Sequence, residues 1–212
     1  MVAATHLLFI TFAFLAAAKP SPPVNFDRCP DDLNPVFVPN IFQFVVPAQT
    51  FFNATGSFFD SEWYTGPLRG TTGKDNTIGA TRTANFSSTI YTERLIDFKK
   101  TPDRILQRFT LDNGPINVDG LVLTYTEEIV IQSICNGTSV WASFTDKLCA
   151  SNTAAGFNLF SRSRILLVDA LASGLGALYS DGSCPSGRST IWIIGRVYVY
   201  SLTRGKISFM SV

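Results

Sequence analysis

The dipeptide Asn136-Gly137 constrains the fold of this 212-residue chain more than any other feature of its sequence. It separates two runs, "TYTEEIVIQSIC" and "TSVWASFTDK", that are rich in β-branched and aromatic residues. Asn-Gly supplies the two positive φ angles that a type I′ turn between antiparallel strands requires. A regular hairpin centred there places Cys149 opposite Thr124, on the order of 36 Å along the strand from Cys135. The hairpin therefore disfavours a disulfide between Cys135 and Cys149.

The chain before this hairpin also has the period of two that is typical of strands. Runs rich in Ile, Leu, Val, Thr, Phe and Tyr predict strands over residues 78–84, 89–98, 105–112 and 121–134. An earlier run, 36–46, is predicted to be an edge strand, because Pro39 has no backbone N–H to donate to a neighbouring strand. The sequence therefore predicts a meander of antiparallel strands.

Helices are predicted on both sides of the meander. After the first strand, four phenylalanines recur too irregularly for a strand and favour one or two short helices, with Gly56 between them. After the last strand, Ser161 is the expected N-cap of a longer helix, whose apolar stripe consists of Val168, Leu171, Leu175 and Leu178. Gly174 and Gly176 each weaken that helix by about 1 kcal/mol and favour close packing on a sheet or a ligand. This order of elements predicts an α+β fold with one sheet curled around one helix.

The first 18 residues have the features of a secretory signal peptide. An apolar run from Leu7 to Leu15 precedes small residues at Ala16 and Ala18, the arrangement that a signal peptidase cuts. The run is too short to span a membrane, and we expect no transmembrane segment. We therefore expect a secreted protein with a signal peptide over 1–18, a proline-rich leader over 19–35 and one domain from residue 36.

Cleavage after Ala18 removes His6, which is the only histidine of the chain. The mature chain then has no imidazole for Ser-His-Asp or Cys-His catalysis or for a His-ligated metal site. We expect no bound metal and no organic cofactor. The net charge is +1 and no basic run stands out, so nucleic acid is not an expected partner.

The cysteines and the glycosylation sequons also fit a secreted protein. An even cysteine count in a secreted chain without a C-x-x-C motif favours two disulfides over a zinc site, formed by Cys29, Cys135, Cys149 and Cys184. The N-x-[ST] sequons begin at Asn53, Asn85 and Asn136. Two of them lie at predicted turns, which favours their glycosylation.

Three segments together resemble the SRPBCC superfamily of polyketide cyclase/dehydrase-like, START-like and Bet v 1-like proteins. They are "WYTGPLRGTTGKDNTIGATRTANFSSTIYTERLIDF", "FTLDNGPINVDGLVLTYTEEI" and "TSVWASF", within a similarity that runs from about Val36 to Leu178. The resemblance implies a helix-grip fold over residues 36–184, in which a curved antiparallel sheet wraps around a long C-terminal helix. It also implies an apolar cavity for a lipid, sterol, polyketide or similar molecule. Residues 185–212 have no counterpart in the family and form an extra C-terminal tail.

The resemblance also implies a disulfide pairing. In a helix-grip topology the first strand lies antiparallel to the last, which brings Cys29 towards Cys149. The final helix runs back along the sheet and brings Cys184 towards Cys135 at the hairpin turn. We therefore expect the pairs Cys29–Cys149 and Cys135–Cys184.

The candidate ligand-binding residues follow from the same fold. They are Trp63, Tyr64, Arg82, Tyr91, Glu93, Phe109, Tyr125, Trp141, Leu171 and Leu175. Any one aromatic side chain is more often ordinary core packing than cavity wall. Arg82 can reach Glu93 across the turn at Asn85, and the pair either satisfies only itself or orients a carbonyl or hydroxyl of a ligand.

Two other acidic residues, Glu127 and Glu128, are weaker candidates for a catalytic or binding role. Glu127 and Glu128 are neighbours on one strand, so they point to opposite faces and cannot act together as a carboxylate pair. We expect these glutamates at the solvated surface.

We expect a secreted carrier or binding protein for a hydrophobic small molecule. One alternative is a cyclase- or dehydratase-type enzyme that uses Asp60, Glu62, Tyr91 or Glu93 as acid or base, and another is a non-catalytic extracellular interaction protein. A carrier requires an apolar cavity on the order of several hundred Å³. An enzyme requires two facing acid or base groups in that cavity, and an interaction protein requires a filled interior with an exposed apolar patch.

Overall fold

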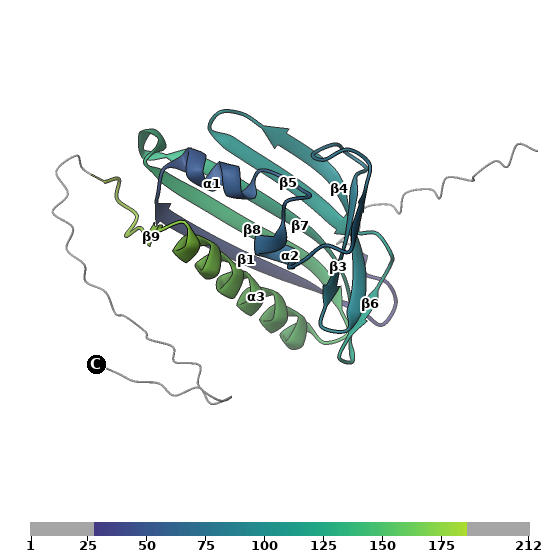
Figure 1. Ribbon diagram of the computed structural model, residues 1–212. Coiled ribbons are helices and arrows are strands. Elements are labelled where there is room, and N and C mark those ends of the chain that lie inside the picture. Colours follow the sequence, from purple (N-terminus) through teal and green to yellow (C-terminus); the bar gives the residue numbers. More distant parts are fainter. Residues whose placement is uncertain (1–27, 186–212) are drawn as a thin grey trace, which may run out of the picture.

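The computed structural model describes residues 28–185 and has an α+β fold (Figure 1). Its helices are α1 (Ala48–Thr55), α2 (Glu62–Thr65) and α3 (Thr153–Gly174). Its strands are β1 (Asn34–Val45), β2 (Gly70–Thr72), β3 (Thr81–Phe86), β4 (Thr89–Lys100), β5 (Arg104–Leu111), β6 (Ile116–Val118), β7 (Leu121–Ile134), β8 (Ser139–Ala150) and β9 (Leu178–Tyr179). The expected signal peptide, most of the leader and nearly all of the C-terminal tail lie outside the described residues.

The strands form one antiparallel sheet in the order β2-β3-β4-β5-β7-β8-β1-β9, and β6 pairs with β7. The first strand, β1, therefore lies beside the last long strand, β8. On its other side, within residues 28–185, β1 pairs only through Phe44 and Val45 with β9, so the segment around Pro39 lies at an edge of the described sheet as expected. The strands predicted from the period of two are confirmed with shifts of a few residues, whereas β2, β6 and β9 were not expected.

The hairpin between β7 and β8 is confirmed. Cys149 lies opposite Thr124 in the register. Asn136 and Gly137 have φ angles of 54° and 86°, and the backbone N–H of Thr138 donates to the carbonyl of Cys135 at 3.3 Å. A type I′ turn requires positive φ angles at both of its central residues, and Asn-Gly was expected to supply them.

All three helices lie on one face of the sheet (Figure 1). The two short helices are confirmed, and Gly56 is the C-cap of the first. The predicted start of α3 is wrong: the N-cap is Asn152, nine residues before Ser161, and its side chain accepts from the Ala155 N–H at 3.0 Å. A strong Asn N-cap followed by alanines makes that earlier start favourable.

The predicted apolar stripe also extends too far. The helix ends at Gly174, Gly176 has a φ of 66°, and Leu178 pairs with Val45 in β9. Gly174 and Gly176 do not mediate close packing within the described part of the chain, since a Cβ at either would have none of its atoms within 4 Å. Gly156 does so instead, because a Cβ there would lie 3.0 Å from the Cβ of Ala150 on β8. The first turns of α3 are thus held closely against the sheet.

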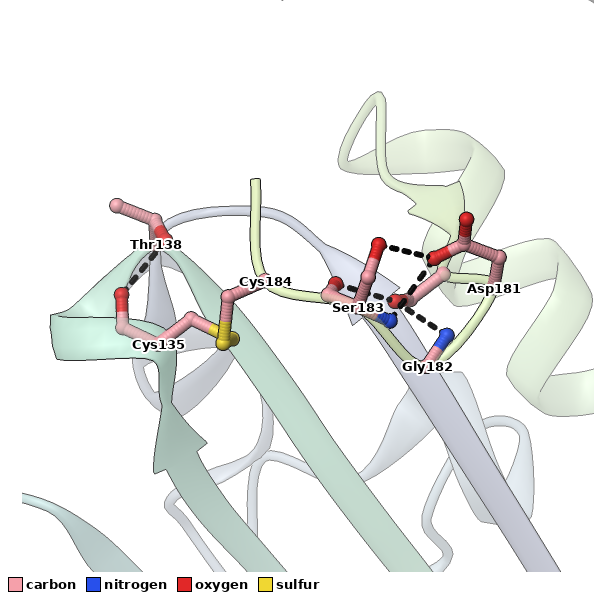
Figure 2. The surroundings of a disulfide bond; sticks show 7 residues. Cys135, Thr138, Asp181, Gly182, Ser183 and Cys184 are labelled. Atoms are coloured by element: carbon pink, nitrogen blue, oxygen red, sulfur yellow. Dashed lines mark hydrogen bonds between the residues drawn. A yellow bond between two sulfur atoms is a disulfide. The ribbon is translucent and has the colours of Figure 1, made fainter. Parts of the chain in front are cut away.

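Two disulfides join the chain, with the expected pairing. Cys29 is bonded to Cys149 and Cys135 to Cys184, with Cα–Cα distances of 5.5 Å and 5.3 Å. Figure 2 shows the second disulfide tying the segment after β9 to the turn between β7 and β8. Two such pairs are consistent with an extracellular protein.

The side chains of all three sequon asparagines are exposed, namely Asn53, Asn85 and Asn136. Among residues 28–185, no helix is long and apolar enough to cross a membrane.

Candidate functional site

A cavity lies between α3 and the inner face of the sheet, and its water-accessible volume is about 70 Å³. Its walls come from α2, α3 and the strands β3, β4, β6 and β7. The aliphatic and phenylalanine side chains of the wall are Phe86, Ile116, Val118, Leu123, Leu159, Phe160 and Leu167. The polar ones are Tyr64, Thr65, Tyr91, Glu93, Tyr125, Ser163 and Arg164. The cavity is therefore apolar over most of its wall, with a set of polar groups among the apolar ones.

Glu93 occupies the sheet side of this cavity and is fully engaged by its neighbours. Its Oε1 accepts from the Tyr125 hydroxyl at 2.6 Å, and its Oε2 accepts from Nε of Arg82 at 2.6 Å. Glu93 and Arg82 lie directly opposite each other on β4 and β3, and both are buried. The predicted Arg82–Glu93 pair is therefore present, with Glu93 at the cavity wall.

Aromatic rings enclose the Arg82 guanidinium behind that wall. Its carbon lies 4.4 Å and 4.5 Å from the ring centres of Phe58 and Phe109. Its Nη1 donates to the backbone carbonyl of Phe58 at 3.0 Å. These contacts fix the guanidinium, and through it the carboxylate of Glu93.

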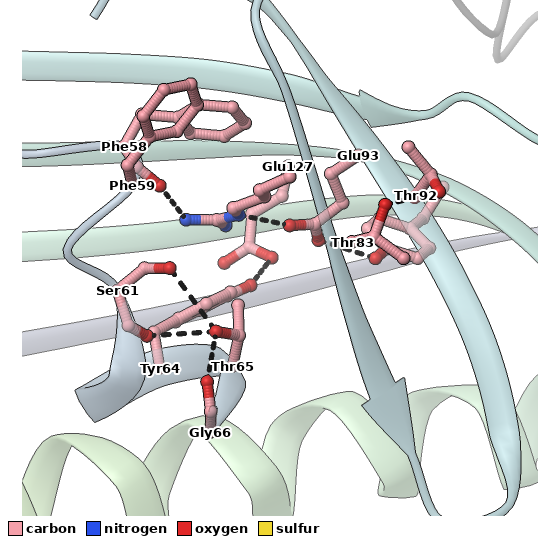
Figure 3. A network of polar contacts seen from close by, with 12 residues as sticks. Phe58, Phe59, Ser61, Tyr64, Thr65, Gly66, Thr83, Thr92, Glu93 and Glu127 are labelled. Atoms are coloured by element: carbon pink, nitrogen blue, oxygen red, sulfur yellow. Dashed lines mark hydrogen bonds and ion pairs between the residues drawn. The ribbon is translucent and has the colours of Figure 1, made fainter. Parts of the chain in front are cut away.

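A second cation, Arg164, enters the same region from α3. Its Nη2 donates to Glu127 and, at 3.3 Å, to Asp146. The Tyr64 hydroxyl also donates to Glu127, and Figure 3 shows this contact beside Glu93. The Tyr64 ring centre lies 4.4 Å from the Arg164 guanidinium carbon and 5.2 Å from that of Arg82. Tyr64 thus joins the two ion pairs into one buried cluster.

The cluster contains more carboxyl groups than cations. Burial, opposed by the nearby Arg164 guanidinium and assisted by Asp146, raises the pKa of Glu127 to about 8. Burial likewise raises the pKa of Asp146. The Glu127–Asp146 pair therefore retains a proton at neutral pH. Two guanidiniums then face two carboxylates and one neutral acid, so the cluster has no net charge.

Tyr91 differs from these residues because its hydroxyl makes no hydrogen bond to another described residue. The side chain is only 6% exposed and lines the cavity. Burial raises the pKa of Tyr91, so the phenol stays neutral and can both donate and accept.

The structure brings together only some of the predicted site residues. Four of them line the cavity, namely Tyr64, Tyr91, Glu93 and Tyr125. Arg82 and Phe109 lie just behind the wall, and Trp63 packs edge-on against Phe144 in the core.

The other candidates lie elsewhere. Trp141 is on the opposite face of the sheet, because its neighbours Val140 and Ala142 both point into the core. Leu171 and Leu175 pack against the core from the C-terminal end of α3 without lining the cavity. The alternative catalytic residues Asp60 and Glu62 are exposed.

Three residues of the buried cluster were not predicted from the sequence, namely Glu127, Asp146 and Arg164. Glu127 was expected at the solvent but is completely buried, as is Asp146. A signal was present in the sequence, because the hairpin register that pairs Thr124 with Cys149 also pairs Glu127 with Asp146. The helix start at Asn152 was missed as well, so the cavity-lining residues Leu159 and Phe160 were not placed on α3.

Comparisons with known proteins identify the fold alone. No protein-family profile and no curated protein matches the chain. The solved structures that resemble it include an uncharacterized protein from Bacillus thuringiensis, with 12% identity, a TM-score of 0.52, and coverage of 66% of this chain and 98% of that one. A hypothetical protein from Helicobacter pylori has 10% identity, a TM-score of 0.53, and coverage of 66% and 87%. The protein XoxI from Bacillus cereus has 12% identity, a TM-score of 0.51, and coverage of 66% and 95%.

Proposed function

We propose that this chain is a secreted binding protein of the helix-grip type, which holds a compact, mostly apolar molecule between α3 and the sheet. The observation that supports this most is the cavity itself. Its wall combines aliphatic side chains from α3, β6 and β7 with a small number of buried polar groups. Small-molecule sites commonly have this composition, in which apolar walls provide affinity and a few polar groups provide orientation.

The helix-grip assignment is supported by three features of the fold. The first strand lies beside the last long strand, all helices lie on one face of the sheet, and α3 follows the meander (Figure 1). The register of β4 against β5 shifts between Leu95 and Asp97, and such a bulge bends a sheet. These features agree with the resemblance to the SRPBCC superfamily.

The size of the cavity narrows the class of ligand. A volume of about 70 Å³ is well below the roughly 300 to 1,000 Å³ that accommodates a drug-sized molecule. This volume is also too small for a whole lipid molecule to be enclosed. The proposal is therefore a ligand of one ring or a short branched chain, not a complete sterol or acyl chain.

The geometry favours binding over the two alternatives. Glu93 is the one acidic side chain among the proposed catalytic residues that lines the cavity, and its hydrogen bonds from Tyr125 and Arg82 favour the ionised form and make the carboxylate a weaker base. An interaction protein with a vestigial site would have a filled interior, which the open cavity argues against.

The extracellular part of the proposal rests on several independent features. The two disulfides and the exposed side chains of the sequon asparagines are compatible with secretion. The N-terminal sequence has the pattern of a signal peptide.

Two neighbouring residues of α3 offer a matched test of the site. Leu167 lines the cavity, whereas Leu166 is 69% exposed. We would titrate phenol, toluene and cyclohexanol into the wild type, Leu167→Trp and Leu166→Trp and follow binding by calorimetry. Leu167→Trp should abolish binding by filling the cavity, and Leu166→Trp should leave it unchanged. If no compound of the panel binds the wild type, or if the two variants bind equally, the proposed site is wrong.

A further inference from the structure

The hydroxyls that line the cavity are not equivalent. Those of Tyr64, Tyr125, Ser163 and Thr65 each donate to a protein oxygen: to Glu127, to Glu93, to the Phe160 carbonyl at 3.0 Å and to the Gly66 carbonyl at 2.8 Å, respectively. The Tyr91 hydroxyl has no partner among the described residues. It is also not one of the fully enclosed polar atoms that lack a partner, so it keeps accessible surface. Since Tyr91 lines the cavity, its hydroxyl is the one among the cavity hydroxyls that is positioned to bind a polar atom of a ligand.

The charged groups around the cavity are paired with one another as ions. Arg82 pairs with Glu93, and Arg164 pairs with Glu127 and Asp146, although Nη2 of Arg82 and Nε of Arg164 make no hydrogen bond to a described residue. A ligand carboxylate entering the cavity would lose its hydration and would be a fourth acidic group beside two guanidiniums that already face three. An ammonium group would meet the Arg164 guanidinium at the wall and a Glu93 carboxylate whose oxygens are already used. The cluster therefore disfavours both signs of charge.

We infer that the ligand is uncharged and carries one hydroxyl or carbonyl oxygen, which hydrogen-bonds to Tyr91. This inference rests on the proposed binding function and specifies its ligand class: compact neutral alcohols, phenols and carbonyl compounds, with free fatty acids and amines excluded. Tyr91 acts as the specificity-determining residue, and the aliphatic side chains hold the remainder of the molecule.

Pairs of compounds with nearly equal shape separate the roles of polarity and charge. Phenol and toluene differ by a hydroxyl in place of a methyl group, and benzamide and benzoate differ mainly in charge at pH 7. We would measure the dissociation constant of each compound by calorimetry for the wild type, Tyr91→Phe and Tyr179→Phe. Tyr179 is 59% exposed and donates to Asp169, so it serves as a control for the loss of a tyrosine hydroxyl outside the cavity.

The wild type should bind phenol about three- to tenfold more tightly than toluene, the effect of one net hydrogen bond. Tyr91→Phe should remove that preference while changing toluene affinity less than about twofold, which also shows that the variant is folded. Tyr179→Phe should keep the wild-type preference. Benzamide should bind at least about tenfold more tightly than benzoate, because benzoate must bury its charge.

The outcomes distinguish this inference from the proposed function. If toluene binds and the preference for phenol is absent from the wild type or persists in Tyr91→Phe, the role of Tyr91 is refuted and the cavity function stands. If benzoate binds as tightly as benzamide, the exclusion of charge is refuted. If none of the four compounds binds, both the ligand class and the binding function are refuted.

Discussion

Glu127 and Asp146 lie directly opposite each other on β7 and β8, and both carboxyl groups accept a hydrogen bond from the same nitrogen of Arg164. Neither side chain is exposed to solvent. Because Arg164 belongs to α3, this contact connects the helix to the centre of the sheet on which it packs. The contact also fixes Tyr64 through its hydrogen bond to Glu127. The polar part of the cavity wall is thus held by the same interactions that hold the helix.

Replacing Arg164 by methionine should destabilise the protein strongly. The variant keeps most of the side-chain volume but leaves Glu127 and Asp146 without their cation. Removing one partner of a buried ion pair typically costs about 3 to 5 kcal/mol. Urea unfolding of Arg164→Met at pH 8 should show a loss of this size, and the exposed Arg162→Met should change the free energy of unfolding by less than about 0.5 kcal/mol. Equal stability of the two variants would contradict a structural role for Arg164.

The pH dependence of stability should reveal the buried acid. Burial raises the pKa of Glu127 from 4.5 to about 8, so the folded protein holds this proton more tightly than the unfolded chain does. Its contribution to the free energy of unfolding is therefore complete below about pH 4.5 and is lost as the pH rises through about 8. Glu127→Gln stays neutral at every pH, so its stability should fall less between pH 5 and pH 9 than that of the wild type.

Urea unfolding at several pH values between 5 and 9 measures this difference. Glu128→Gln is the matched control, because Glu128 is the next residue on the same strand and pairs with Arg108 away from the cluster. It separates the loss of the buried acid from the general loss of one acidic group. Parallel pH profiles for the wild type and Glu127→Gln would contradict the protonation of the buried pair.

The two disulfides should contribute unequally to stability. Cys29–Cys149 joins residues 120 positions apart, whereas Cys135–Cys184 joins residues 49 positions apart. A crosslink that closes a longer loop restricts the unfolded chain more. Each double alanine variant should lose about 2 to 5 kcal/mol, with the larger loss for Cys29→Ala/Cys149→Ala. Guanidinium unfolding of both variants decides the order, and a larger loss for the Cys135–Cys184 pair would contradict the loop argument.

Secretion with glycosylation is a further prediction. Expression of the full chain in a eukaryotic secretory host should deliver protein to the medium, with glycans at Asn53, Asn85 and Asn136. Treatment with an N-glycosidase should then increase the electrophoretic mobility, and each Asn→Gln substitution should remove one glycan by mass spectrometry. Retention of an unglycosylated chain inside the cell would refute the proposed location.

The strands were predictable because their signals are local. The Asn136-Gly137 turn fixes the register of β7 and β8, and alternating apolar residues mark β3, β4 and β5. The expected disulfide pairing was correct because it follows from which strand ends lie together. By contrast, β6 and β9 have three and two residues, which is too short for a periodic pattern to be recognised.

The site was only partly predictable. Tyr64, Tyr91, Glu93 and Tyr125 were identified because aromatic and acidic residues on inward-facing positions are visible in the sequence. Glu127 was misplaced because a glutamate is rarely buried without a partner, and its partners come from β8 and α3. The size of the cavity depends on the packing of side chains from six elements, which no local pattern encodes.

A crystal structure of the protein soaked with 4-bromophenol tests the binding site most directly. The bromine gives an anomalous signal that locates the compound without reference to the protein coordinates. We predict one peak among Leu123, Leu159 and Leu167, with the phenol oxygen within hydrogen-bonding distance of the Tyr91 hydroxyl. An empty cavity, or bromine peaks confined to the outer surface, would contradict the claim that this protein binds a compact neutral molecule between α3 and the sheet.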